Sequence, residues 1–180
     1  MLEVGPKDCL RNLCQSLPNI QYVGIDLNSP YATVRTDLTQ LSFASDVFDM
    51  VICFHVLEHI PYDTVAMKEI LSVLKPKGMA LIQVPINGEH TFENPAADRA
   101  EKEEIFGQRD HVRFYGLDIR DRLAAVGFDV MVESYVDFLD HEIIRRYALT
   151  GDDRVVLVCH KFADHVRIRD LAVVNQGKSI

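Results

Sequence analysis

The sequence predicts an α/β fold built on a mostly parallel sheet, and three observations support this fold class. Segments with the apolar pattern of strands alternate along the chain with segments of helical periodicity. One segment, Phe48–Phe54, is almost continuously apolar, which is typical of a strand buried on both faces. Asp26 ends a short apolar run 21 residues after Gly5 ends another, as in a βαβ unit that binds a nucleoside.

Three short strands and one helix are expected before the buried strand. Leu2–Gly5 is the first predicted strand, and Gln21–Asp26 is the second. Between them, Asp8–Leu17 carries its apolar residues at helical spacing, and Pro18-Asn19 breaks the pattern. Ala32–Asp37 is the third predicted strand.

The same alternation continues after the buried strand. Thr64–Leu74 is amphipathic, and Pro76-Lys77-Gly78 ends it, as expected after a helix C-cap. Further helices are predicted at Tyr115–Val126, which Gly127 closes, and at Asp140–Leu149. The remaining predicted strands are Met79–Val84, Val130–Val136 and Arg154–Lys161.

One domain is expected over residues 1–162, followed by a C-terminal tail at 163–180. Within the domain, residues 87–115 are mostly polar and charged and lack clear periodicity, apart from a short predicted helix at Arg99–Phe106. Stretches of this length are more often lids or binding segments than simple connections. We therefore predict that residues 87–115 form a substrate-binding or lid segment.

Composition and charge disfavour several classes of function. The net charge of −8 argues against a nucleic-acid backbone as the main partner, because phosphate binding depends on clusters of Lys and Arg. No apolar run approaches the roughly 20 residues of a membrane span, and the N-terminus lacks the pattern of a signal peptide. The four cysteines have no CxxC spacing, which favours a reduced, cytoplasmic protein with Cys53 as a core thiol.

The loop after the first strand indicates which kind of nucleoside binds. It reads Gly5-Pro6-Lys7-Asp8-Cys9-Leu10, with one glycine where a dinucleotide site needs about three. Pro6 removes a backbone donor, and Asp8 places a negative charge near any phosphate. The loop therefore suits a nucleoside without phosphates, of which S-adenosylmethionine is the common one. It disfavours the alternative of a nicotinamide-dependent oxidoreductase.

Several segments of the chain carry a family resemblance. They read LEVGP, YVGIDL, RTDLTQLSF, FDMVICFHVLEHI and LKPKGMALIQVPI within about residues 1–86, with FGQRDHVRFYG further on. In these segments the chain resembles class I S-adenosylmethionine-dependent methyltransferases of the small type-11 kind. The resemblance implies a Rossmann-like seven-stranded sheet in the order 3-2-1-4-5-7-6, with the last inserted strand antiparallel and helices on both faces.

Relatives in this family usually carry one or two helices before the first strand, and these helices help to cover the cofactor. The present sequence opens directly on that strand, so the N-terminal helices are expected to be missing. The chain is then a shortened form, a natural minimal form, or a homodimer whose partner supplies the cover.

The resemblance also implies roles for residues at the first two strands. Glu3 matches the acidic residue that usually faces the methionine amino group, often through water, and Gly5 matches the glycine that leaves room for the cofactor. Asp26 matches the acid that binds the ribose hydroxyls, and Leu27 matches the apolar residue beside the adenine.

The matching residues of the next two strands complete the implied cofactor site. Asp37 matches the carboxylate that accepts a hydrogen bond from the adenine amino group, and the backbone N–H of Leu38 is placed to reach a ring nitrogen. Phe54 and His55 match the end of the fourth strand, where the methionine part and the transferred methyl group lie.

Histidines near this strand end are the candidates for chemistry. His55, Glu58 and His59 fall at positions i, i+3 and i+4, so they would share one face of a helix. Two imidazoles and a carboxylate are suitable ligands for a divalent ion, with His111 as a further ligand from later in the chain. The alternative is that Glu58-His59 is a helix-start feature that also occurs in family members without metal, and the sequence leaves the question of a metal open.

His111 alternates with Arg113 and Tyr115 in the later segment. One interpretation is an active-site wall in which His111 is the first candidate for a general base, followed by His55 and His59, while Arg113 anchors the substrate. The other interpretation is a half-exposed strand or helix start that ties the long loop down.

The predicted activity is methyl transfer from S-adenosylmethionine to a small-molecule acceptor by in-line displacement, with S-adenosylhomocysteine as the product. The alternative is a degenerate module that binds the cofactor or a partner without catalysis, which the altered glycine loop favours. A nucleic-acid methyltransferase is disfavoured by the net charge.

Overall fold

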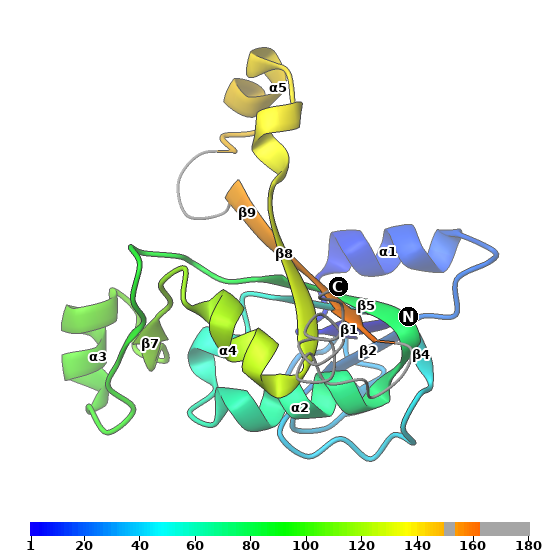
Figure 1. The fold of residues 1–180 in the computed structure, drawn as a ribbon, viewed down its shortest axis with the longest axis horizontal. Coiled ribbons are helices and arrows are strands. Elements are labelled where there is room, and N and C mark those ends of the chain that lie inside the picture. The colour runs from blue at the N-terminus through cyan, green and yellow to red at the C-terminus, as the bar shows by residue number, and fades with distance from the viewer. Residues whose placement is uncertain (150–153, 163–180) are drawn as a thin grey trace, which may run out of the picture.

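The computed structural model describes residues 1–149 and 154–162, and the predicted tail at 163–180 lies outside them. Strands and helices alternate along this part of the chain, as predicted (Figure 1). In chain order the elements are β1 (Leu2–Val4), α1 (Asp8–Ser16), β2 (Val23–Asp26), β3 (Val34–Arg35), β4 (Phe48–Phe54), the 3₁₀ helix η1 (Leu57–His59), α2 (Asp63–Val73), β5 (Leu74–Gln83), β6 (Phe92–Glu93), α3 (Arg99–Phe106), β7 (Arg113–Phe114), α4 (Ile119–Val126), β8 (Phe128–Ser134), the 3₁₀ helix η2 (Tyr135–Phe138), α5 (His141–Arg146) and β9 (Val155–Lys161).

The main sheet has seven strands in the order β3-β2-β1-β4-β5-β9-β8. The five strands from β3 to β5 are parallel to one another, whereas β9 is antiparallel to both of its neighbours. This is the strand order that the family resemblance implies, and the prediction of an antiparallel inserted strand is confirmed. Because β1 lies between β2 and β4, the loops that follow these three strands meet at one edge of the sheet.

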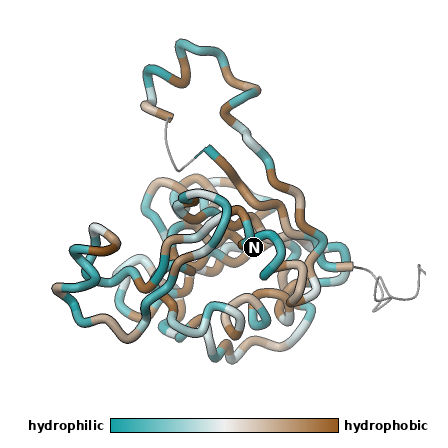
Figure 2. The backbone as a smooth tube through the Cα atoms, turned by 60° about the vertical axis from the view of Figure 1, so that its left-hand side comes forward, coloured by the Kyte–Doolittle hydropathy of each residue, from teal (hydrophilic) through white to brown (hydrophobic). Residues whose placement is uncertain are grey.

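Helices cover the sheet on both sides. Figure 1 shows α1 on one side and α2 and α4 on the other. Val51, Ile52 and Cys53 are buried in succession along β4, and successive residues of a strand point to opposite faces. Both faces of β4 are therefore covered, as its apolar pattern predicted, and Cys53 is a core thiol. The hydrophobic residues gather in the strands of the sheet (Figure 2).

Three element boundaries differ from the predictions for physical reasons. The strand predicted at Ala32–Asp37 is only Val34–Arg35, an exposed edge strand that pairs with β2 alone. β5 begins at Leu74 rather than Met79, because Leu74 already pairs with Phe48. The helix predicted from Tyr115 begins at Ile119, since Tyr115 forms a parallel bridge with Ile86 and its carbonyl accepts the Asn87 N–H (2.7 Å).

The elements near the C-terminal end of the described chain also shift. The strand predicted at Val130–Val136 begins two residues earlier as β8. The last residues of the predicted strand belong instead to the 3₁₀ helix η2. The helix predicted at Asp140–Leu149 is the shorter α5. β8 and β9 carry η2 and α5 away from the body of the molecule, so this pair of strands forms a projecting arm (Figure 1).

Residues 87–115, the predicted lid segment, form a small substructure at one end of the molecule (Figure 1). β6 and β7 pair in antiparallel fashion, and α3 has the bounds that the sequence predicted. A capping box begins α3: the Asp98 side chain accepts hydrogen bonds from the backbone, and the Glu101 side chain accepts the Asp98 N–H in return. Closure of this segment over a substrate stays a prediction.

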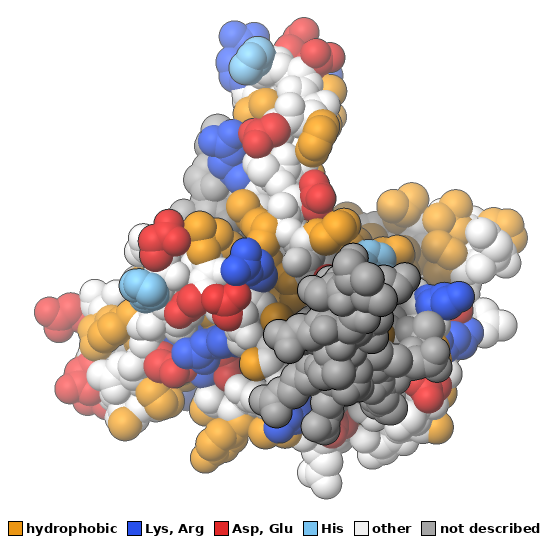
Figure 3. Space-filling view, viewed as in Figure 1, with side chains coloured by type: hydrophobic (Ala, Val, Ile, Leu, Met, Phe, Trp, Pro, Cys, Tyr) orange, Lys and Arg blue, Asp and Glu red, His pale blue; other side chains and the backbone are white. Residues whose placement is uncertain are grey.

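The molecular surface mixes charges of both signs. Figure 3 shows Lys, Arg, Asp and Glu side chains interspersed over the face in view, without a large basic patch on that face. This distribution agrees with the argument from net charge against a nucleic-acid backbone as the main partner. None of the helices in residues 1–149 and 154–162 combines the length and apolar character that crossing a bilayer requires.

Lys161, at the end of β9, holds the C-terminal end of α2. Its Nζ donates hydrogen bonds to the carbonyl oxygens of Leu71 (2.9 Å) and Leu74 (2.8 Å) and to the Asp46 carboxylate (2.7 Å). These carbonyls belong to the last turn of the helix and the residue after it, where intrahelical donors run out. Lys161→Met is expected to lower the free energy of unfolding by about 1–3 kcal/mol, measured by urea denaturation.

The matched control for this change is Lys75→Met, which removes an exposed lysine that pairs with the exposed Asp49. Exposed ion pairs contribute little to stability. Equal urea midpoints for the Lys161 and Lys75 variants would contradict the capping role of Lys161.

Candidate functional site

A cavity of about 610 Å³ lies beyond the carboxyl ends of β1, β2 and β4. Ligands of open parallel sheets bind at this edge. The predicted site residues that line the cavity are Gly5, Asp26, Leu27, Asp37, Leu38, His55 and His59. The structure thus brings together seven of the ten predicted residues. The other three, Glu3, Phe54 and His111, do not line the cavity, and their direct contact with a ligand stays a prediction.

Gly5 makes the turn from β1 into the cavity wall. Its φ is +66°, a left-handed conformation that glycine adopts without steric cost. A Cβ at this position would also lie 2.9 Å from Cγ2 of Val56, which is closer than such atoms approach. The Gly5 N–H donates to the Ile25 carbonyl oxygen (2.9 Å), so the turn is fixed against β2.

The carboxylates of Asp26 and Asp37 are each fixed by hydrogen bonds from the loop that follows them. Oδ1 of Asp26 accepts the N–H groups of Asn28 (2.6 Å) and Ser29 (2.7 Å). Oδ1 of Asp37 accepts the N–H and the hydroxyl of Thr39, both at 2.8 Å. In each case the bonds recorded for the carboxylate use one oxygen to hold the loop. The second oxygen is then available to accept hydrogen bonds from a ligand.

Two leucines follow these carboxylates and give the cavity apolar surface. Leu38 is buried, whereas Leu27 is 55% exposed. An exposed leucine beside a cavity offers an apolar face to a flat ring, and the adjacent carboxylates offer acceptors to its polar groups. This combination of apolar walls with a few fixed polar groups is typical of a small-molecule site.

Glu3 occupies the position where a phosphate would otherwise bind. The N–H of Lys7, the residue that caps α1, donates to Oε1 of Glu3 (2.9 Å), and the Tyr22 hydroxyl donates to Oε2 (2.6 Å). Burial and this hydrogen bond raise the pKa of Tyr22. A helix N-terminus attracts anions. Here the chain's own buried carboxylate and Asp8 in the first turn supply the negative charge, so the start of α1 is a poor phosphate site.

The histidine side of the cavity differs from the helical arrangement that the sequence predicted. His55 follows β4 with a φ of 57°, an unusual conformation for a residue with a side chain. Glu58 and His59 lie in the 3₁₀ helix η1, so the three residues do not share one face of an α-helix. His55 Nδ1 nevertheless lies 3.6 Å from Oε1 of Glu58, and both histidines line the cavity.

His111 lies behind His59 as seen from the cavity. The two imidazole rings pack edge to face, with 4.6 Å between their centroids and 79° between their planes. His111 is buried, and burial, followed by the nearby His59, lowers its pKa. Nδ1 of His59 lies 3.3 Å from the Asp110 carboxylate, without the geometry of a hydrogen bond. The structure therefore joins all three predicted histidines in one group.

Arg113 does not anchor a substrate, because its side chain is buried away from the cavity. Its guanidinium donates to the carbonyl oxygens of Leu57 (2.8 Å), Ile60 (2.5 Å) and Pro61 (2.9 Å). The arginine is 1% exposed. The structure thus supports the other interpretation of this segment: Arg113 ties the long loop to η1.

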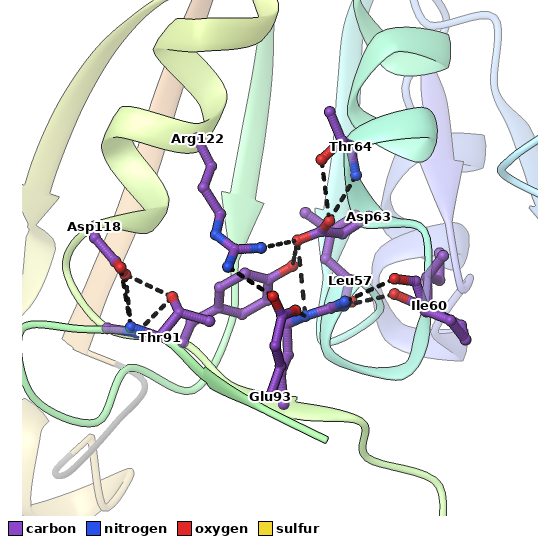
Figure 4. A network of polar contacts seen from close by, with 12 residues as sticks. Leu57, Ile60, Asp63, Thr64, Thr91, Glu93, Asp118 and Arg122 are labelled. Carbon is purple, nitrogen blue, oxygen red and sulfur yellow. Dashed lines mark hydrogen bonds and ion pairs between the residues drawn. The ribbon is translucent and has the colours of Figure 1, made fainter. Parts of the chain in front are cut away.

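A polar network surrounds this arginine (Figure 4). Asp63, at the start of α2, accepts hydrogen bonds from the Tyr115 hydroxyl (2.7 Å) and Arg122 (3.1 Å). Glu93 of β6 accepts from both Arg113 (3.1 Å) and Arg122 (3.0 Å). Burial and the nearby Asp63 raise the pKa of Tyr115. The network joins η1, α2, α4 and the 87–115 segment beside the histidines.

Tyr62 and Asp110 are among the cavity residues that sequence reasoning missed. Tyr62 is 73% exposed and lines the cavity after η1. Asp110 is the residue by which the long segment reaches the cavity. Tyr62 shows no local pattern beyond its place before the predicted helix at Thr64. The only sequence signal for Asp110 is its position next to the candidate residue His111.

The fold and the cavity together define a class of proteins: Rossmann-like domains that bind a nucleoside without phosphates at the carboxyl edge of the sheet. The chain belongs to the methyltransferase domain family, whose model matches residues 2–133. It is a class I S-adenosylmethionine-dependent methyltransferase domain, and S-adenosylmethionine is the cofactor of this class. A comparison with curated protein sequences found no match.

Solved structures share the fold at low sequence identity. A crystal structure of an S-adenosylmethionine-dependent methyltransferase from Mesorhizobium loti has a TM-score of 0.65 and 16% identity, over 89% of this chain and 90% of that chain. One from Archaeoglobus fulgidus has a TM-score of 0.58 and 17% identity, over 89% and 85%. The [4+2]-cyclase SpnF has a TM-score of 0.61 and 18% identity, over 91% and 75%.

The residues of the cavity fit S-adenosylmethionine. Gly5 lines the cavity in a tight turn, where a side chain would collide with Val56. Asp26 and Asp37 each keep one carboxylate oxygen outside the bonds that hold their loops, as needed to accept from a ribose and from an adenine amino group. Glu3 blocks the phosphate position at α1, which the cofactor does not use. These observations favour this cofactor over a dinucleotide.

Proposed function

We propose that the chain transfers the methyl group of S-adenosylmethionine to a small-molecule acceptor that binds beside His55 and His59. One observation carries the proposal: the same cavity is lined by Asp26 and Asp37 and by these histidines. A cofactor and an acceptor can therefore meet in one space. The net charge of −8 supports a small acceptor over a nucleic acid.

The residues of the chain divide between binding the cofactor and receiving a proton. Bound S-adenosylmethionine supplies a methyl group that is already activated as a sulfonium. Asp26 accepts hydrogen bonds from the ribose hydroxyls and Asp37 from the adenine amino group, while Leu27 packs against the ring. These contacts orient the reactants, and alignment is the main contribution that methyl transfer requires from the protein.

The histidines act where the acceptor carries a proton that must leave, as a hydroxyl does. His59 lines the cavity and is the residue that we place against the acceptor, with His55 beside it. His111 packs on the edge of His59 and positions its ring. A neutral imidazole is a suitable proton acceptor near neutral pH. The 87–115 segment, which reaches the cavity through Asp110, would exclude water.

Two measurements test the proposed function. Titration calorimetry with S-adenosylhomocysteine should show binding of one molecule per chain, and labelled S-adenosylmethionine should transfer its methyl group to a component of a metabolite pool. Binding without transfer would favour the alternative of a module that holds the cofactor without catalysis, which is consistent with the different activity of SpnF on the same fold. No binding by folded protein would remove the proposal.

His59→Gln is expected to lower turnover by about 100-fold while leaving the affinity for S-adenosylhomocysteine nearly unchanged, because the ring acts on the acceptor and not on the cofactor. His90→Gln is the matched control, since His90 is an exposed histidine outside the cavity lining. Equal turnover of the two variants would show that His59 takes no part in the reaction.

A further inference from the structure

Three side chains beside the cavity share an unusual property. Glu58, His59 and His111 each place a potential metal-ligand atom within 4.8 Å of the others. In the part of the chain that the structure describes, four buried side-chain nitrogen or oxygen atoms lack a hydrogen-bond partner. Three of these atoms belong to this cluster: Glu58 Oε2, His59 Nδ1 and His111 Nδ1.

Leaving such atoms without partners is costly, above all for a carboxylate. Glu58 is 1% exposed, and the only contact recorded for its side chain joins Oε1 to His55 Nδ1 at 3.6 Å. Buried polar groups in folded proteins are nearly always hydrogen-bonded, paired with an opposite charge or bound to a metal. A divalent cation bound among the three side chains would balance the carboxylate charge and give the cluster a shared polar partner.

We propose that Glu58, His59 and His111 bind a divalent first-row transition-metal cation beside the cofactor cavity. One carboxylate and two imidazoles suit Zn²⁺, Fe²⁺, Co²⁺ or Mn²⁺ better than Mg²⁺ or Ca²⁺, which prefer oxygen ligands alone. Three protein ligands leave coordination positions for water or for another molecule. Because His59 also lines the cavity, the ion borders the space in which the acceptor is placed.

The chain holds the two halves of this cluster together without the ion. The Val112 N–H donates to the Glu58 carbonyl oxygen (2.9 Å), which fixes the segment that carries His111 against η1. Arg113 binds the Leu57 carbonyl on the other side of Glu58. The Asp110 carboxylate, 3.3 Å from His59 Nδ1, adds a further negative charge beside the cluster. Ligands from segments about 50 residues apart are thus arranged in advance.

A bound cation would activate a hydroxyl group of the methyl acceptor, and this consequence rests on the proposed function. With the cation bound, His59 is a ligand, so the proton of an acceptor hydroxyl that binds the cation leaves to His55, which also lines the cavity, or to solvent, and the oxygen keeps the electron pair of the broken O–H bond. That oxygen then forms the new bond to the methyl carbon as the bond from carbon to sulfur breaks. The acceptor class that this chemistry favours is a hydroxyl compound.

The test is calorimetric titration of metal-free full-length protein with Zn²⁺, together with the visible d–d absorption of bound Co²⁺. The wild type should bind one cation per chain. Glu58→Gln, which keeps the shape of the side chain, and His59→Gln should each weaken binding by at least about tenfold and remove the Co²⁺ absorption. His90→Gln and Cys9→Ser should leave both signals unchanged, because these exposed residues lie outside the cluster.

The outcomes separate this proposal from the proposed function. Absence of cation binding by folded wild type, or binding that survives both cluster variants, overturns the metal site. Binding that is lost in Cys9→Ser but not in Glu58→Gln overturns it too, because the ion would then bind to a thiol. Binding of S-adenosylhomocysteine is measured separately, so a cation site can stand even if methyl transfer fails. Should Glu58→Gln fail to fold, the partly exposed His59 provides the second variant.

Discussion

Arg113→Met is expected to lower the free energy of unfolding by about 3–5 kcal/mol, the largest stability effect that we predict for a single substitution. The arginine is 1% exposed, so its removal leaves the carbonyl oxygens of Leu57, Ile60 and Pro61 without their side-chain donor. Methionine fills a similar volume, so the loss reflects polar groups and not a cavity. Buried acceptors without partners are destabilising.

Urea denaturation of Arg113→Met should therefore show a lower midpoint than the wild type. Arg120→Met is the matched control, because Arg120 is exposed and pairs only with its neighbour Asp121 among the contacts recorded. Surface pairs of this kind contribute little. If both variants unfold at the same urea concentration, the guanidinium of Arg113 does not hold the 87–115 segment to η1.

The arrangement of the sheet could be predicted because its signals are local. The continuous apolar run Phe48–Phe54 gives the buried strand, and the glycine turn with Asp26 gives the first βαβ unit. α3 was predicted with the bounds that the structure has, and the structure shows that the residues that cap it, Asp98 and Gly107, directly flank it in the sequence. Where the sequence pattern that defines a helix or strand lies within a few residues, the element can be predicted from the sequence alone.

The errors arise where distant segments decide the local structure. The expected helix start at Tyr115 fails because this residue bonds Asp63, 52 positions earlier, and forms a bridge with Ile86. Arg113 has the sequence context of a substrate anchor, and only the fold shows its guanidinium among the carbonyls that follow β4. Periodicity carries no information about such pairs, so neither could be found from the sequence alone.

The cofactor site contains residues that could be predicted from the sequence and contacts that could not. Asp26 could be found from its place at the end of a predicted strand, and Asp37 from the family resemblance; the parallel strands bring both to one edge of the sheet. Glu3 could be identified as an acidic residue of the first strand. Its hydrogen bonds with Lys7 and Tyr22 could not be predicted, because they depend on how α1 begins. Those bonds give a physical reason for the sequence argument against a dinucleotide: the anion position at the helix start is already filled by a carboxylate.

Asp26→Asn is expected to weaken the binding of S-adenosylhomocysteine by on the order of 1,000-fold, the largest effect on affinity that we predict. Two hydrogen bonds from ribose hydroxyls to a carboxylate are each worth about 1.5–3 kcal/mol, and every 1.4 kcal/mol is a factor of ten. Asparagine keeps an oxygen for the N–H groups of Asn28 and Ser29, so the loop should keep its shape. Its amide nitrogen cannot accept from a hydroxyl.

This substitution separates the two uses of one carboxylate, which Asp26→Ala would remove together. Calorimetry gives the affinity, and thermal unfolding without ligand reports whether the loop is intact. Asp49→Asn serves as the control, since Asp49 is an exposed carboxylate on β4 that does not line the cavity. An unchanged affinity in Asp26→Asn would mean that the second oxygen meets no ribose. The cavity would then have to orient a nucleoside through Asp37 and Leu38 alone, which hold only its base.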